Sequence, residues 1–415
     1  MLNVSRDFAP PFKMIEPFFK YGSIFYLLSL ISLLFIDINA PLDDFKIVGF
    51  AHLFLLGFVM IVIFGAMAQL IPVALEVGHF SIDLYYVIFP TLFFGTILLV
   101  SGFWFSPSFI PYGATLVFVS MAIFLFETLM TLKKTTTNTL TVKAIKYGNY
   151  FLTAAIIIGL LMAVAIANGI GIDITKFLPI HAVLVIFGYV TITIIGFSMI
   201  LLPMFGLAHG YDDRDVNLAF KIITYSVVAF SIFKLLSLDF LANLTLVAIV
   251  AALFLYLKQL LILYKIRARK ILDIWYQHIY VAFISMIAGV LVGVIGYFFE
   301  LSNFLKAGIW LYLMGFFVFI INGHLLKIIP FLVWFERFSP LVGKKKVPML
   351  HEMLPQKDCD FSFYFSVAGL IVATLGLLFE NEAIFKGGVT LFIFGAIFML
   401  KIVIYILNYK EEDYV

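Results

Sequence analysis

The chain has 415 residues, of which 64% are hydrophobic, 18% aromatic and only 12% charged, with a formal net charge of +3. Soluble domains carry about 25% charged residues, so this composition excludes a soluble globular enzyme, a disordered chain and a coiled-coil or collagen-like repeat. The single cysteine, Cys359, excludes a disulfide framework, a Cys-ligated iron–sulfur cluster and a structural zinc finger. The remaining class is an all-α polytopic membrane protein.

Twelve apolar segments follow one another along the chain, and each approaches or exceeds the roughly 20 residues that a spanning helix needs. In chain order they lie near 22–37, 48–74, 82–103, 109–132, 149–169, 177–206, 218–236, 239–264, 277–299, 304–335, 362–379 and 385–408. The lead-in at 1–20 has no cleavable signal pattern, so the first span is expected to stay as an anchor. The lipid bilayer is therefore the first partner, and no nucleic-acid partner is expected.

Lysine and arginine residues predict the orientation, because cytoplasmic loops are enriched in them. The loops on the side of the two termini hold 18 of these residues, among them Arg6, Lys133, Lys134 and the run 344–346, whereas the opposite loops hold five. Both termini are therefore expected in the cytoplasm, and the expected location is a bacterial inner membrane. The run 344–346 is also a candidate for contact with anionic lipid.

A spaced Gly/Pro pattern occurs once in each of the second, sixth and tenth spans. A glycine is followed after eight residues by a second glycine and after seven more by a proline: Gly57, Gly65 and Pro72; Gly188, Gly196 and Pro203; Gly315, Gly323 and Pro330. The first glycines are 131 and then 127 residues apart. At about 100° per residue, the three positions share one stripe of an α-helix. Such a stripe lets helix backbones approach closely in lipid, or leaves room for a large planar ligand.

The position of the pattern predicts three tandem four-helix modules, 21–135, 149–265 and 277–408, within a single membrane domain, 1–415. Because each module has an even number of spans, the modules share one orientation, whereas secondary transporters more often have inverted repeats. This architecture resembles the twelve-helix subunit I of heme-copper oxidases. In that family, helices two, six and ten are related by a pseudo-threefold axis and carry heme and metal ligands.

Three of the seven histidines lie in the repeat spans. His52 and His181 stand at the outer ends of the second and sixth spans, and His324 lies in the inner half of the tenth. Ionisable residues inside a membrane are candidates for function, and neutral imidazole is the commonest metal ligand and an axial ligand of heme iron. The alternative is that each histidine caps a helix end or bonds a neighbouring carbonyl. For His79, His209, His278 and His351, near the cytoplasmic interface, that alternative is favoured.

The stretch AHLFLLGFVMIVIFGAMAQLIP resembles the second-helix motif of the NnrS family, in which a histidine stands five residues before a glycine and the helix ends in proline. NnrS proteins are twelve-helix, heme-containing membrane proteins linked to nitric oxide metabolism. The resemblance implies that His52 is the motif histidine and that His209, in LAHGY, occupies the place of a Gly-His pair after the sixth helix. Phe50 stands where the family often has a second histidine, which favours a sister subfamily.

This resemblance implies a cofactor, which we expect to be heme, with copper or iron as the other metals considered. His52, His181 and His324 are the candidate heme ligands, and His52, His181 and His209 are the candidate metal ligands. Partners from the respiratory chain or from heme handling are implied as well. The physiology implied is respiratory or related to nitric oxide.

The histidine set of a working oxidase is missing. The seventh span has no histidine, His181 is followed four residues later by Val185 rather than tyrosine, and the tenth span lacks two histidines that flank one residue. Oxygen reduction at a heme–copper centre is therefore not expected. Whether the protein is an enzyme at all stays open, and the sequence favours a protein that is not one.

Three polar residues in the spans predict a polar inner vestibule. Gln69 and Lys327 each lie twelve residues after the first glycine of their repeat, and Glu127 lies in the inner half of the fourth span. Lys327 is expected either to reach the interface or to pair with a heme propionate, a lipid phosphate or Glu127.

Two other functions are considered. A transporter or permease suits twelve spans with polar residues near the midplane. A membrane metallopeptidase is suggested by His351-Glu352, but zinc proteases need HExxH, and the fifth residue here is Pro355.

Overall fold

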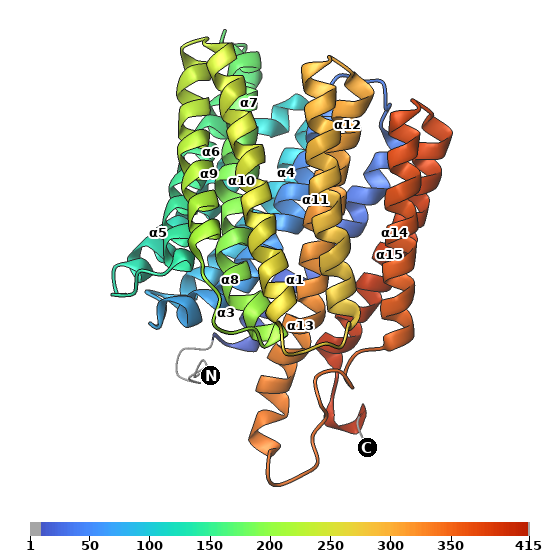
Figure 1. The fold of residues 1–415 in the computed structure, drawn as a ribbon. Helices are drawn as coiled ribbons and strands as arrows, with labels where there is room; N and C mark the ends of the chain where they lie inside the picture. The colour runs from blue at the N-terminus through green and yellow to red at the C-terminus, as the bar shows by residue number, and fades with distance from the viewer. Residues whose placement is uncertain (1–9, 414–415) are drawn as a thin grey trace. The chain divides into compact units, whose positions relative to one another are not determined.

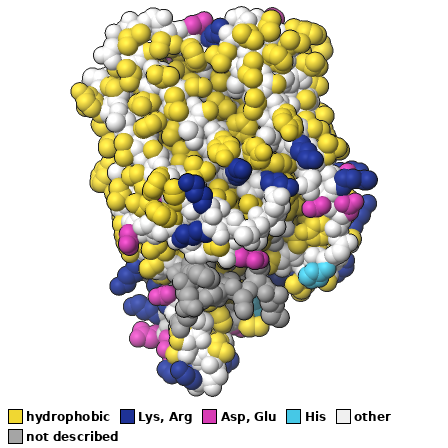
Figure 2. Space-filling view, turned by 90° about the vertical axis from the view of Figure 1, so that its left-hand side faces the viewer, with side chains coloured by type: hydrophobic (Ala, Val, Ile, Leu, Met, Phe, Trp, Pro, Cys, Tyr) yellow, Lys and Arg dark blue, Asp and Glu magenta, His cyan; other side chains and the backbone are white. Residues whose placement is uncertain are grey.

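The computed structural model describes residues 10–413, and these residues form helices and connections without a β-strand. Arg6, one of the basic residues used to predict orientation, lies outside them. Twelve helices are long and apolar enough to cross a membrane. On the face shown in Figure 2, hydrophobic side chains cover most of the surface, and lysine and arginine side chains gather toward the lower part. The predicted class of polytopic helical membrane protein is confirmed.

The described residues form two compact units, and only the ends of α3 and α4 cross from one unit's set of helices to the other. Unit 1 comprises 69–102 and 106–271, and unit 2 comprises 10–68, 103–105 and 272–413. The helices of unit 1 are α4 (Tyr85–Trp104), α5 (Ile110–Leu132), α6 (Leu140–Asn168), α7 (Ile174–Val183), η6 (Leu184–Thr191), α8 (Ile192–Gly206), α9 (Arg214–Leu235) and α10 (Asp239–Ile266). Those of unit 2 are α1 (Phe12–Ser32), α2 (Phe45–His52), η3 (Leu53–Met60), α3 (Ile61–Leu75), α11 (Ile274–Phe298), α12 (Ser302–Trp310), η7 (Leu311–Phe317), α13 (Val318–Arg337), α14 (Gln356–Leu378) and α15 (Glu382–Asn408). The last residues of α3 belong to unit 1, and the last residues of α4 belong to unit 2.

All twelve predicted spans coincide with these helices, but several helices begin earlier than the hydropathy predicts. The fifth begins at Leu140 instead of 149, because the Thr139 hydroxyl accepts a hydrogen bond from the amide of Val142 at 3.3 Å and caps it there. The first helix begins at Phe12 and includes Lys13 and Lys20. Hydropathy marks the apolar part of a span, whereas caps and turns mark the end of the helix.

Each of the three repeat spans contains a π-helical segment around its first glycine. The segments are η3, η6 and η7, and they contain Gly57, Gly188 and Gly315. In every case an α-helix precedes and follows the segment, so the span is continuous. Short π-helical segments inside α-helices are rare, and those that occur frequently lie at functional sites.

The glycines of the repeat face the helix that precedes them in the chain. A Cβ added at Gly57 would lie 2.7 Å from Phe25, and one at Gly65 would lie 2.5 Å from Phe18, both in α1. The equivalent glycines meet α6 and α11 in the same way. The residues met are seven apart in all three cases: Phe25 and Phe18, Phe151 and Ala144, and Ser285 and His278.

The π-helical segments explain why glycines eight residues apart meet residues seven apart. Seven residues are about two turns of α-helix, with a rise of about 10.5 Å. Eight residues cover the same rise when one turn is π-helical, because a turn bonded from i to i+5 contains one additional residue. The predicted stripe therefore holds for the two glycines, but a π-helical turn produces it rather than a regular 100° step.

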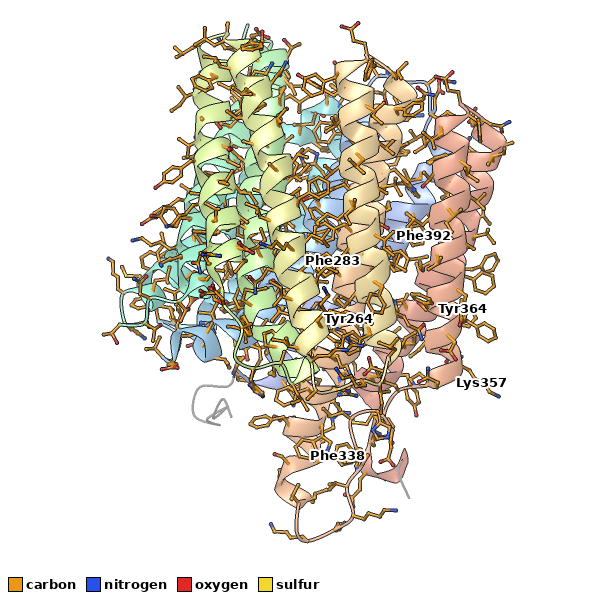
Figure 3. All side chains as sticks on the ribbon, in the orientation of Figure 1. Tyr264, Phe283, Phe338, Lys357, Tyr364 and Phe392 are labelled. Carbon is orange, nitrogen blue, oxygen red and sulfur yellow. The ribbon has the colours of Figure 1, made fainter. Side chains whose placement is uncertain are left out.

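The prolines of the repeat do not all precede a helix end. The helices end three residues after Pro72 and Pro203. The carbonyl of Pro72 accepts from the amide of Val77 at 3.3 Å, and the carbonyl of Pro203 accepts from the amide of Ala208 at 3.0 Å. After Pro330, helix α13 continues to Arg337. Figure 1 shows this extension and the connection to α14 projecting beyond the other helices of unit 2, and Figure 3 labels Phe338 at the end of α13. The proline of the repeat therefore does not by itself fix where the helix ends.

A second set of close approaches occurs in the pairs α4–α5 and α14–α15. A Cβ added at Gly102 would lie 2.8 Å from the amide nitrogen of Ile110, and one at Gly369 would lie 2.5 Å from that of Phe392. Gly113 and Gly388 likewise face the backbones of Leu99 and Ala373. Antiparallel neighbours therefore touch through their backbones, which a side chain at these positions would prevent.

We expect that replacing Gly65, Gly196 or Gly323 with leucine destabilises the folded protein. The loss should be at least about 1–3 kcal/mol, which is the usual cost of overpacking a core. Each added side chain would collide with the preceding helix. Thermal unfolding of the detergent-purified variants measures the effect. Gly387→Leu is the matched control, since a Cβ there meets nothing within 4 Å. Equal melting temperatures for all four variants would contradict the packing role.

Reporter fusions test the orientation of the twelve spans. Fusions after Lys134, Lys270 and Lys346 are expected to report the cytoplasm, because positive charges stay on that side. Fusions near Asp173 and Glu300 are expected to report the opposite side. A cytoplasmic signal at Asp173 would contradict the alternation of four spans per module.

Candidate functional site

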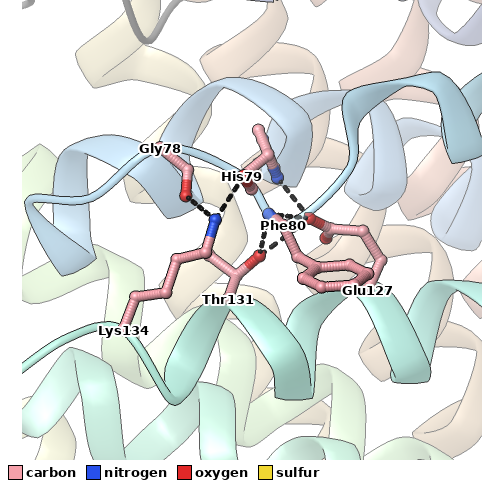
Figure 4. Close-up of polar contacts among 6 residues, drawn as sticks. All are labelled: Gly78, His79, Phe80, Glu127, Thr131 and Lys134. Atoms are coloured by element: carbon pink, nitrogen blue, oxygen red, sulfur yellow. Dashed lines mark hydrogen bonds and ion pairs between the residues drawn. The ribbon is translucent and has the colours of Figure 1, made fainter.

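A deeply buried ionisable pair joins His79 and Glu127 in unit 1 (Figure 4). His79 lies in the short connection between α3 and α4, and Glu127 lies in the last third of α5. The two side chains are 3% and 0% exposed, and His79 Nδ1 lies 2.8 Å from Glu127 Oε1. The ring of Tyr85 meets the His79 imidazole edge to face at 5.4 Å. A charge this deep in an apolar span needs such partners.

The end of α5 binds the connection through several further bonds. Glu127 Oε1 accepts from the amide of Phe80 at 3.1 Å and from the Thr131 hydroxyl at 2.8 Å. The ammonium of Lys134 donates to the carbonyls of Gly78 and His79, at 3.3 and 2.7 Å. The polar groups at the end of α5 therefore hold the residues between α3 and α4 in place.

This pair contains a residue that the sequence does not indicate. The sequence favours an interfacial His79, where polar groups cost little, but its side chain is buried. The usable signal is Glu127 itself, since a carboxylate within an apolar span requires a donor. The sequence cannot show which donor it is, because 47 residues separate Glu127 from the amide of Phe80 that also binds it.

His52 is half-buried at the end of α2, directly before the π-helical segment η3. Its Nδ1 lies 2.8 Å from the carbonyl of Val48, and its ring stacks on Phe103 at 5.1 Å. The alternative that the histidine bonds a carbonyl is thus confirmed for Nδ1. A histidine that ligates a metal characteristically uses its other ring nitrogen for such a bond, so this geometry suits ligation through Nε2.

The indole of Trp104 lies against the same turn of α2 as His52. Its Nε1 is buried and has no hydrogen-bond partner in the part of the chain that the structure describes. A Cβ added at Gly49 would lie 2.5 Å from this nitrogen, and the Lys46 ammonium lies 5.8 Å from the ring centre. The surroundings of His52 thus offer a buried donor and a cation, which suit an acceptor-bearing group.

His181 is held by a neighbouring helix rather than by its own. Its Nδ1 lies 2.9 Å from the carbonyl of Ala155 in α6, and a Cβ at Gly159 would lie 3.0 Å from the ring. Like His52, it is half-buried and lies just before a π-helical segment. His52 and His181 belong to different units, so a ligand shared between them stays a prediction.

His324 lies within α13, and its Nδ1 is 2.7 Å from the carbonyl of Ile320. Trp275 meets its ring edge to face at 5.9 Å. His278, which the sequence places near the interface, is 2% exposed and packs among Phe319 and Phe363. Both histidines bond carbonyls of their own helices.

His209 is exposed in the connection that follows α8. Two residues on, the Tyr211 hydroxyl donates to the carbonyl of Met199 at 3.3 Å, and burial raises the pKa of this hydroxyl. Across residues 10–413, no group of three or more His, Cys, Asp or Glu side chains is placed to hold a metal ion. His52, His181 and His209 therefore do not form a three-ligand protein site with other such side chains in that range.

Lys327 forms an ion pair with Asp273, with Nζ 2.6 Å from Oδ2. Glu127, in unit 1, is bound to His79. Gln69 is 6% exposed, in the part of α3 that belongs to unit 1, whereas Lys327 belongs to unit 2. The common vestibule of Gln69, Lys327 and Glu127 stays a prediction.

The candidate protease residues lie in a turn outside the spans. His351 and Glu352 are exposed, and Glu352 accepts from the amide of Met349 at 2.7 Å. The Glu352 carboxylate therefore caps a turn, and the fifth position of the motif, Pro355, cannot supply the second histidine that HExxH zinc sites use.

The glycine stripes do not leave room for a planar ligand. Side chains of the preceding helix occupy the space next to both glycines in each of the three repeat spans. The packing alternative for the stripe is thereby confirmed, and a cofactor would contact other faces of these helices.

Comparison with known proteins adds no assignment. No protein-family model matches the chain, and no curated protein sequence matches it.

Replacing His79 with alanine is expected to destabilise the protein by about 1–3 kcal/mol, because it leaves a buried carboxylate oxygen with fewer donors. Thermal unfolding of the purified variant measures the loss. Lys345→Ala is the control, since it removes an exposed ion pair with Glu411 that contributes little. Equal stability of the two variants would show that the buried pair is dispensable.

Proposed function

We propose that this protein is an integral membrane heme- or metal-binding protein of the oxidase-like or NnrS-like type. It would act in respiratory or nitric-oxide-related physiology without reducing oxygen. The observation that carries the proposal is the setting of His52: a half-buried imidazole, oriented through Nδ1 by a carbonyl, directly before a π-helical segment. Such an orienting bond sets the ring direction and basicity of a ligating histidine.

Support for an oxidase-like arrangement comes from the repeat spans. The π-helical segments η3, η6 and η7 lie at the same place in the three spans. The glycines of each repeat span also meet the preceding helix at positions seven residues apart. Shared contacts of this kind favour three four-helix modules with a common orientation.

His52 and the residues around it would hold the heme or metal ion in different ways. His52 Nε2 would ligate the iron. The Trp104 indole and the Lys46 ammonium would contact an acceptor on the bound group. A bound heme supplies electron transfer or the binding of a small gas such as nitric oxide.

A transporter is the second candidate, and buried polar atoms in the spans favour it. Asn322 in unit 2 and Gln259 in unit 1 are at most 2% exposed. Each has at least one polar atom without a hydrogen-bond partner among residues 10–413. In lipid, such groups are costly unless they bind one another, water or a substrate.

The visible spectrum of protein purified from heme-replete cells tests the proposal. We expect a Soret band that His52→Ala removes or shifts, because that variant lacks the ligating nitrogen. His351→Ala is the matched control, since this exposed histidine lies in a turn outside the spans, and it should leave the band unchanged.

Protein without heme absorbance and without bound copper, iron or zinc would contradict the cofactor proposal and favour the transporter. A Soret band that persists in His52→Ala, with His181→Ala now losing it, would move the ligand to the sixth span.

A further inference from the structure

The two carboxylate oxygens of Glu127 have different surroundings. Oε1 accepts from three donors: His79 Nδ1, the amide of Phe80 and the Thr131 hydroxyl. Oε2 is fully buried and accepts from no donor in the part of the chain that the structure describes. Figure 4 shows the bonds on Oε1, all from the connection between α3 and α4 and from the next turn of α5.

No permanently charged cation balances this carboxylate within the cluster. The ammonium of Lys134 donates to two carbonyl oxygens and is exposed. A neutral His79 imidazole can make this bond to Oε1 in the tautomer that carries the proton on Nδ1. A buried carboxylate in these surroundings costs several kcal/mol unless a positive charge compensates it.

Two hydroxyl oxygens from the fourth and sixth spans of unit 1 are also buried. The hydroxyls of Thr128 and Tyr189 are buried and have no hydrogen-bond partner among residues 10–413. Thr128 follows Glu127 directly in α5, and Tyr189 lies in the sixth span of the same unit. Carboxylate and hydroxyl oxygens are hard ligands that suit alkali and alkaline-earth cations.

We propose that Glu127 Oε2, together with the hydroxyl oxygens of Thr128 and Tyr189, forms a binding site for an alkali-metal cation. One carboxylate matches one positive charge, so a monovalent ion leaves the buried site neutral, whereas a divalent ion leaves it positive. The absence of a three-ligand His, Cys, Asp and Glu group in the described range argues against a transition metal here. This site is independent of the proposed heme function and would provide the coupling ion of a transporter.

Thermal unfolding of the full-length protein in detergent tests the site. The melting temperature is measured in lithium, sodium and potassium chloride against choline chloride at the same ionic strength. We expect one alkali salt to raise it with saturation, because an ion that binds only the folded state stabilises that state. Glu127→Gln should abolish the rise, since the neutral amide keeps an acceptor for Phe80 but carries no charge.

Glu76→Gln is the matched control, because this exposed carboxylate lies in the same connection, and it should keep the full rise. Tyr189→Phe should increase the half-saturating concentration severalfold, and it decides the matter if Glu127→Gln does not fold. Equal melting temperatures in all alkali salts and choline would overturn the proposal. An equal rise in wild type and Glu127→Gln, or unchanged half-saturation in Tyr189→Phe, would overturn it as well.

Discussion

Close approach of helix backbones in lipid is the interaction on which this structure depends. Lipid tails provide no hydrophobic driving force between helices, so packing at small residues has to hold spans together. In each repeat span, glycines replace the side chains that would separate the span from the preceding helix. The π-helical segments accompany this contact and let a spacing of eight residues on one helix match a spacing of seven on the other.

The π-helical segments connect packing to the candidate ligands. His52 directly precedes η3, and His181 stands three residues before η6. A π-helical turn changes the angle between the residues before it and the residues after it, so it alters the direction of a preceding histidine relative to the glycine contacts. The tenth span has the same segment, η7, but its histidine lies beyond it at His324. The same glycine contacts and π-helical segment thus occur in three spans whose histidines lie at three different positions.

Buried polar groups show how each unit satisfies its charges. In unit 2, Lys327 meets Asp273 near the end of a span, where both side chains are about one-fifth exposed. In unit 1, Glu127 is fully buried, and one of its oxygens accepts hydrogen bonds from a histidine, an amide and a hydroxyl. The first arrangement balances charge with charge. The second leaves one oxygen without a donor in the described residues, which is why it can hold an ion.

The sequence by itself determined the twelve spans, because the free energy of transferring a segment into the bilayer depends on the residues of that segment. It also indicated close helix packing at the threefold glycine pattern, since small residues let neighbouring helices approach closely. The tertiary structure alone decided what fills the stripe, that a π-helical turn underlies the spacing of Gly57 and Gly65, and that Glu127 binds His79. Those outcomes depend on which residues meet across a helix interface, and a partner 48 residues away leaves no trace in local composition or periodicity.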